Sequence, residues 1–289
     1  MQFYEQLLIN GLVSGGVYML VAIGLTVIFG VLNIVNFAHG EFYMLGGFFA
    51  LLAATYLHLP FPLSLAVAMA GGALLGVVCE RLIFRGGGAQ LKSDTIITSF
   101  GLSIILQNLA LLVFGPLPKM VPTEISGTVK ILSADVSVQR VMVPMIAAVI
   151  VGLLYVVLRY TWTGRALRAT AQQPTVASIV GVDTKKVAVM AFAMGCGLAA
   201  GAGALMGTIF MMSPTIGGPL TLKAFTVVIL GGMGNIPGAI IAGLLLGITE
   251  SFAAGFLGNQ WRDTVAFLFV IAVLVLRPNG IFNSSAARA

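Results

Sequence analysis

Long apolar runs decide what this chain can fold into. About 20 apolar residues cross the hydrocarbon core of a bilayer, which is about 30 Å thick. In lipid every backbone polar group needs a partner within the protein, so only helices and closed barrels can span the core. Because the runs show no polar alternation, they predict helices. They lie near residues 7–31, 41–57, 62–84, 95–114, 142–159, 187–211, 222–234, 236–255 and 262–277.

We therefore expect an all-α polytopic membrane protein, a single transmembrane domain over residues 1–289, with about eight or nine transmembrane helices. The mean hydropathy of +1.06 excludes a soluble globular domain. Some helices should be short or broken, because segment 222–234 reaches only about 20 Å at 1.5 Å per residue. That segment is either a broken helix shielded by its neighbours or a re-entrant element. No internal sequence repeat is evident.

Basic residues predict the topology, because cytoplasmic loops collect Lys and Arg. Three basic regions are therefore predicted to be cytoplasmic: Arg81, Arg85 and Lys92; Arg159 to Lys186; and Arg277 with Arg288. This predicts an N-terminus outside and a C-terminus in the cytoplasm, in the cell inner (cytoplasmic) membrane. The external loop 115–141 holds three of the five exceptions, which are Lys119, Lys130, Arg140, Lys223 and Arg262.

The net charge of +6 lies mainly in these loops, so we interpret it as topology and expect membrane lipid, not nucleic acid, as its surroundings. Cys79 and Cys196 have no metal or redox spacing and are expected in the core. Glycines recur at small-xxx-small spacing, which predicts close helix packing inside the bundle or at a subunit interface. The pairs are Gly11 and Gly15, Gly72 and Gly76, Gly197 and Gly201, Gly203 and Gly207, and Gly243 and Gly247.

Polar residues at membrane depth are costly and usually face the bundle interior or a water-filled path. Candidates for a translocation path or gate are Asn33, Asn36, His39, Glu41 and Glu250. A half-helix beginning near His39 would direct free N–H groups into any cavity there. The alternative is local: Asn36 caps the next helix and Glu41 favours its first turn.

No catalytic arrangement, metal-ligand cluster or G-x-x-x-x-G-K-[ST] phosphate loop occurs in the sequence, so we expect neither an enzyme nor a bound cofactor. "GGMGNIPGA", residues 231–239, lacks the Lys and hydroxyl that hold nucleotide phosphates. It predicts a tight turn between two helices, with Pro237 near the start of the second.

Segment 161–186 is unusual in so apolar a chain, because four of its residues are basic and Asp183 is its only acid. "GRALRATAQQ" favours a helix, and Pro174 suits the first turn of a second helix, "PTVASIV", which Gly181 can end. Connections usually need only about four residues, and this one has more than twenty. A short helical pair with a small apolar contact surface beside its cations predicts a docking element. The apolar residues are Ala166, Leu167, Ala169, Ala171, Ala177, Ile179 and Val180.

Residues 163–183, "TGRALRATAQQPTVASIVGVD", resemble the cytoplasmic coupling motif of ABC-importer permeases. Residues 11–48, 222–247 and the ending "RPNGIF" are similar to the branched-chain amino acid permeases of the LivH type, and the resemblance covers nearly the whole chain. It implies ABC-importer permease architecture and an interface to ATPase subunits. The residues it assigns to that interface are Gly164, Arg165, Arg168, Ala169, Ala177 and Gly181. Pro174 and the pair Gln172–Gln173 depart from the usual pattern of that motif.

The resemblance also implies the partners: a second homologous permease in a heterodimer, two cytoplasmic P-loop ATPase subunits and an extracytoplasmic substrate-binding protein. The expected function is inward translocation of branched-chain or related amino acids, driven by ATP hydrolysis on the partners. Two alternatives stay open. One is a permease for urea or short amides in the same family. The other is a self-sufficient secondary transporter, which would need Glu250, Glu41 and His39 to couple an ion.

Overall fold

The computed structural model describes residues 2–84, 92–131, 134–277 and 280–281, and helices form most of it. Arg85 and Arg288, two of the residues used to predict the topology, lie outside the described residues. The helices are α1 (Gln2–Leu32), α2 (His39–Tyr56), α3 (Phe61–Cys79), α4 (Lys92–Phe114), α5 (Val138–Tyr160), α6 (Trp162–Gln172), α7 (Pro174–Ile179), α8 (Thr184–Gly207), α9 (Gly217–Gly231), α10 (Ile236–Leu257) and α11 (Arg262–Leu276).

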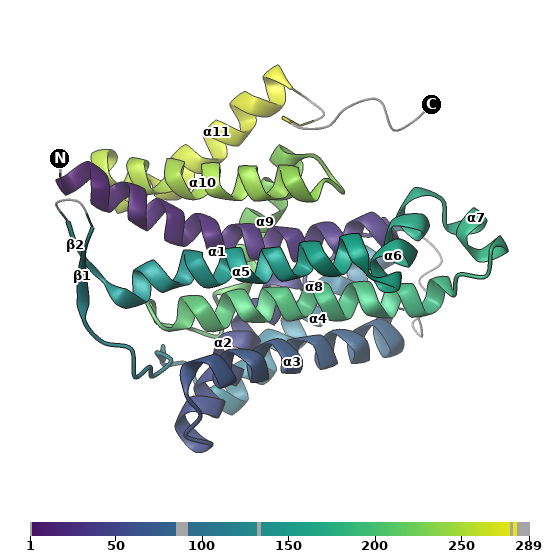
Figure 1. Ribbon diagram of the computed structural model, residues 1–289, viewed down its shortest axis with the longest axis horizontal. Coiled ribbons are helices and arrows are strands. Elements are labelled where there is room, and N and C mark those ends of the chain that lie inside the picture. Colours follow the sequence, from purple (N-terminus) through teal and green to yellow (C-terminus); the bar gives the residue numbers. More distant parts are fainter. Residues whose placement is uncertain (1, 85–91, 132–133, 278–279, 282–289) are drawn as a thin grey trace.

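Short irregular elements join some of these helices. A π-helical turn, Glu80–Phe84, continues α3, and a 3₁₀ turn, Asn259–Trp261, precedes α11. An antiparallel hairpin of β1 (Thr128–Ile131) and β2 (Ala134–Ser137) lies in the predicted loop 115–141, directly before α5. The hairpin and the N-terminus lie at one end of the bundle, and α6 and α7 lie at the other (Figure 1).

Seven helices in the described residues are long and apolar enough to cross a membrane: α1, α3 with its π turn, α4, α5, α8, α10 and α11 with its 3₁₀ turn. The predicted all-α polytopic fold is confirmed, and the chain is a multi-pass membrane protein. The predicted short segment is also confirmed, because α9 has only 15 residues and is too short for that group. The predicted turn before Pro237 separates α9 from α10.

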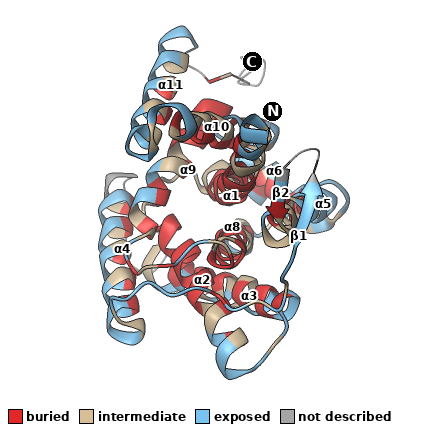
Figure 2. Cartoon of the chain, turned by 90° about the vertical axis from the view of Figure 1, so that its left-hand side faces the viewer, coloured by how far each residue is buried: buried red, intermediate tan, exposed pale blue. Residues whose placement is uncertain are grey.

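One arrangement of helices occurs twice in opposite directions. A long helix, a non-helical break, a second helix and two further helices make up both α1–α4 and α8–α11. Helices α1 and α8 lie side by side at the centre and run antiparallel (Figures 1 and 2). Transporters with sites near the membrane midplane often have such inverted repeats. The repeat is not evident in the sequence. Both halves need small residues where helices touch, but the residues at equivalent positions need not be identical.

Glycines allow close approach of helices at the α1–α10 and α3–α8 contacts. A Cβ added at Gly15 or Gly247 would overlap the backbone of the opposite helix in the α1–α10 contact. Added atoms at Gly72 or Gly76 on α3 would likewise overlap α8. All five predicted glycine pairs thus pack inside the bundle. Cys196 contributes to the α3–α8 contact, and it and Cys79 are buried free thiols, as expected.

A Gly247→Ala substitution should destabilise the protein, because the added methyl group overlaps Gly15 and overpacking costs about 1–3 kcal/mol. Gly101→Ala is the matched control. Its added Cβ meets nothing within 4 Å, and Ala favours a helix over Gly by about 1 kcal/mol. Thermal unfolding of the purified protein in detergent compares the two. Equal melting temperatures would contradict this account of the α1–α10 contact.

Candidate functional site

The break between α1 and α2 returns the chain to the middle of the bundle. Asn33 has a positive φ of 52° at the end of α1, and residues 33–38 are not helical. His39, the first residue of α2, donates from Nε2 to the Val21 carbonyl over 3.0 Å. Val21 lies eleven residues before the end of α1, which is about 16 Å at 1.5 Å per residue. Helix α2 therefore begins about half the thickness of the hydrocarbon core from the end of α1.

The N-terminus of α9 meets the N-terminus of α2 at this point. The Gly40 N–H donates to Thr221 Oγ1 over 2.9 Å. A Cβ added at Gly217, the first residue of α9, would overlap the carboxylate of Glu41. Helix α4 completes the contact, because Ser103 donates its hydroxyl to Glu41 Oε1 over 2.9 Å. The Phe37 N–H donates to Ser99 Oγ of α4 over 3.1 Å in the same place. We call this group the polar junction: Phe37, Gly40, Glu41, Ser99, Ser103, Gly217 and Thr221.

Two helix N-termini meet beside Glu41, and aligned peptide dipoles give each a partial positive charge. At the start of α2 the Phe37, Ala38 and Gly40 N–H groups already have side-chain partners. Glu41 itself is only 1% exposed. Its Oε2 has no hydrogen-bond partner among the described residues. Paired half-helix ends of this kind can bind the charged groups of a small solute.

The predicted path residues divide into three places. Asn36, His39 and Glu41 lie together and are buried. Asn36 accepts a hydrogen bond from the Ala38 N–H over 3.0 Å, so it caps the turn before α2, whose own N-cap is Ala38. Asn33 is exposed at the end of α1, apart from this group. Glu250 lies on α10 in a different cluster.

Glu250 is fully buried and holds the centre of a charged cluster. Its Oε2 accepts from Tyr18 Oη over 2.6 Å and from Arg262 Nε over 2.8 Å. Lys223 Nζ lies 2.9 Å from Glu250 Oε1 and 2.7 Å from Asp263 Oδ1. The charged cluster consists of Ser14, Tyr18, Lys223, Glu250, Arg262 and Asp263, from α1, α9, α10 and α11. Two cations balance two carboxylates.

Sequence reasoning missed the partners of Glu250, although one signal pointed to them. Lys223 and Arg262 were exceptions to the predicted distribution of basic residues. Each belongs to an ion pair with Glu250 inside the protein, so neither reports on loop topology. An isolated charge at membrane depth costs about 2.5–3.5 kcal/mol on insertion scales, which explains why these charges pair.

A cavity of about 540 Å³ joins the polar junction to the charged cluster. Ser103 and Thr221 line it from the junction, and Lys223 and Asp263 line it from the cluster. Its walls are largely apolar, formed by Phe37, Phe100, Pro219, Leu222 and Phe267. It therefore offers hydroxyls, one cation and one anion beside an aromatic surface.

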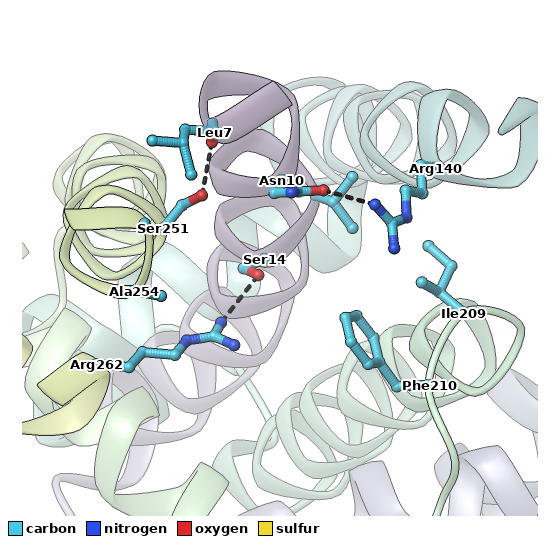
Figure 3. Close-up of a pocket in the computed structure, with 11 residues that line it drawn as sticks. Leu7, Asn10, Ser14, Arg140, Ile209, Phe210, Ser251, Ala254 and Arg262 are labelled. Atoms are coloured by element: carbon cyan, nitrogen blue, oxygen red, sulfur yellow. Dashed lines mark hydrogen bonds between the residues drawn. The ribbon is translucent and has the colours of Figure 1, made fainter. Parts of the chain in front are cut away.

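A second, smaller pocket of about 330 Å³ lies near the N-terminal end of α1 (Figure 3). Arg262 points across it to Ser14, with Nη2 and Oγ 3.1 Å apart. On its other side Arg140 donates to Asn10 over 3.0 Å. The charged cluster thus lines both hollows: Ser14 and Arg262 face this pocket, and Lys223 and Asp263 face the cavity.

The segment predicted to dock forms two short helices, α6 and α7, as expected. Thr161 caps α6 by accepting from the Gly164 N–H over 3.2 Å. A Cβ added at Gly164 would overlap the backbone of Leu158, so this glycine permits the tight turn from α5. The Arg168 guanidinium donates to the Leu158 carbonyl and fastens α6 to the end of α5. Gly181, with φ +88°, follows α7.

The six residues predicted to contact the ATPases differ in their solvent exposure. Arg165, Arg168 and Gly181 are exposed and Ala169 is half-buried, whereas Gly164 and Ala177 are buried in the segment itself. Four large apolar side chains of the segment are at least half exposed: Trp162, Val176, Ile179 and Val180. We call these four the apolar docking surface. Within the described residues no group of three or more His, Cys, Asp or Glu could hold a metal ion.

Comparison with known proteins gives matches over nearly the whole chain. The family described as the permease component of branched-chain amino acid transport systems matches residues 7–274. The high-affinity branched-chain amino acid permease BraD of Pseudomonas aeruginosa is 35% identical over 97% of this chain and 96% of its own. LivH of Escherichia coli is 33% identical over the same shares. LivM of that organism is 24% identical over 92% of this chain and 67% of its own. No solved structure gave a significant match.

Removing the carboxylate of Glu250 should destabilise the protein. Glu250→Ala leaves Lys223 and Arg262 without their buried partner, and breaking a buried ion pair costs about 3–5 kcal/mol. Glu250→Gln keeps a hydrogen-bonding group and should lose less stability than Glu250→Ala. Thermal unfolding in detergent measures both, with the exposed Glu124→Ala as the control. Unchanged stability of Glu250→Ala would show that the cluster contributes nothing to the fold.

Proposed function

We propose that this chain, which belongs to the permease family of branched-chain amino acid transport systems, is the membrane-spanning subunit of an ABC importer for branched-chain or related amino acids. The observation that carries the proposal is the match to residues 7–274, which includes the projecting α6–α7 segment. Relatives that cover nearly the whole chain are permeases for these amino acids.

Two P-loop ATPase subunits supply the energy from the cytoplasm. The sequence itself contains no G-x-x-x-x-G-K-[ST] loop, so ATP hydrolysis must come from partners. The apolar docking surface and the exposed Arg165 support contact with them, since exposed apolar groups rimmed by charge are typical of interaction sites. This orientation puts α6, α7 and the C-terminus in the cytoplasm, and the hairpin and N-terminus outside the inner membrane.

A second, homologous permease completes the pathway. The likeness to LivM, a permease of the same kind of system, supports a heterodimer. The cavity opens between α4, α9 and α11, and Ile97, Ile104, Leu268 and Ile271 on α4 and α11 are exposed beside it. An extracytoplasmic binding protein delivers the amino acid to the outer side. Closure of the ATPases then moves α6 and α7 and alternates access to the cavity.

The chemistry of the cavity supports an amino acid as the solute. Lys223 can pair with its carboxylate and Asp263 with its ammonium group, and the two protein groups lie 2.7 Å apart. The zwitterion would enter this ion pair without leaving a net charge in the membrane. Phe37, Phe100 and Phe267 then face its branched side chain. Specificity among amino acids lies largely with the binding protein.

The two alternatives make different demands on the same residues. Urea or a short amide has no charges to match Lys223 and Asp263. A self-sufficient secondary transporter needs a carboxylate that can release a coupling ion. Glu250 is instead fixed by Lys223 and Arg262, which supports the importer.

Reconstitution of the chain with its partner permease, ATPases and binding protein tests the proposal. We expect ATP-dependent uptake of labelled leucine into proteoliposomes, with no uptake when the ATPases are omitted. Uptake of urea or acetamide but not leucine would identify the first alternative. Leucine uptake without ATPases, driven by an ion gradient, would identify the second and overturn the proposal.

Arg165→Glu should lower leucine uptake at least about tenfold, the equivalent of about 1.4 kcal/mol, because it reverses a charge at the proposed ATPase interface. Membrane insertion should not change, since the side chain is exposed. The control is Arg81→Glu, an exposed arginine outside the α6–α7 segment. Immunoblots of membrane fractions check insertion, and co-purification checks ATPase binding. If Arg165→Glu takes up leucine at the wild-type rate, this residue is not part of the ATPase interface.

A further inference from the structure

We infer that a groove on the side of the bundle binds an anionic phospholipid of the cytoplasmic leaflet. The groove has a volume of about 590 Å³ and lies between α1, α5, α6 and the start of α10. It is separate from the cavity and from the charged cluster. The inference goes beyond the proposed function and rests on it for the cytoplasmic position of the α6 end and for the assembly used in the test.

The groove has the length of one leaflet. On α5 it extends from Ala148 to Arg159. Eleven residues of helix span about 16 Å at 1.5 Å per residue. Half of a hydrocarbon core of about 30 Å is about 15 Å. An acyl chain can therefore lie along the whole groove from the middle of the membrane to the α6 end.

The walls of the groove suit an acyl chain. Val27 and Val31 on α1, Leu154 and Leu158 on α5, and Ile240 on α10 make most of them apolar. Glycines keep the groove open, since a Cβ added at Gly152 would meet nothing within 4 Å. Among the described residues that line the groove, none is acidic.

The positive charge of the groove lies at the end nearest α6. In the part of the chain that the structure describes, Arg159 and Arg168 are the charged residues that line it, and both are exposed. Each basic residue near a membrane surface attracts anionic lipid, and arginine pairs well with phosphate. Tyr155 lines the groove one turn before Arg159, at the depth where aromatic residues usually meet headgroups. This charge complementarity selects an anionic headgroup over a zwitterionic one.

The bound lipid would also contact α6, part of the segment proposed to bind the ATPases. Leu167, Arg168 and Ala171 of α6 line the groove, and Arg168 already fastens α6 to the Leu158 carbonyl. A headgroup at Arg159 and Arg168 would join the end of α5 to α6. Anionic lipid thus becomes a structural part of the segment that contacts the ATPases.

Native mass spectrometry of the assembled importer tests the inference without a transport assay. The probes are phosphatidylglycerol and phosphatidylethanolamine with the same acyl chains, added in equal amounts after delipidation in detergent. We expect the wild type to retain phosphatidylglycerol preferentially. Arg159→Gln should lower the ratio of retained phosphatidylglycerol to phosphatidylethanolamine about fivefold, as the loss of one basic contact implies. The exposed Arg81→Gln, outside the groove, should leave the ratio unchanged.

Gly152→Leu provides the second, independent variant. Its side chain enters open space, so the fold should tolerate it while the groove is filled. Retention of both lipids should then fall although both arginines remain. Equal retention of the two lipids by the wild type, or an unchanged ratio in Arg159→Gln, would overturn the inference. So would a crosslink from a photoreactive group at Tyr155 to a partner protein instead of lipid. None of these results would affect leucine uptake as a test of the proposed function.

Discussion

Backbone hydrogen bonding inside the bilayer is the constraint on which this structure depends. Residues 33–38 are not helical and return the chain from the end of α1 to the middle of the bundle, where water cannot satisfy free N–H groups. Protein groups must therefore take that place. The Phe37 N–H donates to Ser99 Oγ over 3.1 Å, the Ala38 N–H to Asn36, and the Gly40 N–H to Thr221. The break thus requires α4 and α9 beside it, and these contacts create the polar junction.

The remaining contacts hold the two halves of the inverted repeat around that junction. Glycine contacts bring α1 to α10 and α3 to α8, which fixes the long helices that enclose the short ones. The charged cluster then ties α9 and α11 to α1 and α10 through Lys223, Glu250 and Arg262. Because both groups line one cavity, the residues that stabilise the fold also provide the polar surface of the proposed path.

The sequence predicted the helices well, because apolar length and Pro or Gly at helix ends are local signals. Pro174, Gly181 and Pro237 lie where they were expected. The contacts of the site could not be predicted in the same way. Glu250 and Tyr18 are 232 residues apart, and Glu41 and Ser103 are 62 apart, so their pairing depends on which helices touch. Local polarity alone also grouped the exposed Asn33 with the buried Asn36.

The most direct test of the proposed path is thiol labelling of Ser103→Cys in the reconstituted importer. The native Cys79 and Cys196 are buried, so background labelling should be low. Ser103 lines the cavity, and we predict that a small membrane-impermeant thiol reagent modifies the introduced cysteine during turnover. Leucine delivered by the binding protein should slow this modification. A cysteine at position 103 that stays unmodified, or a labelling rate that leucine does not change, would contradict a substrate path beside the polar junction.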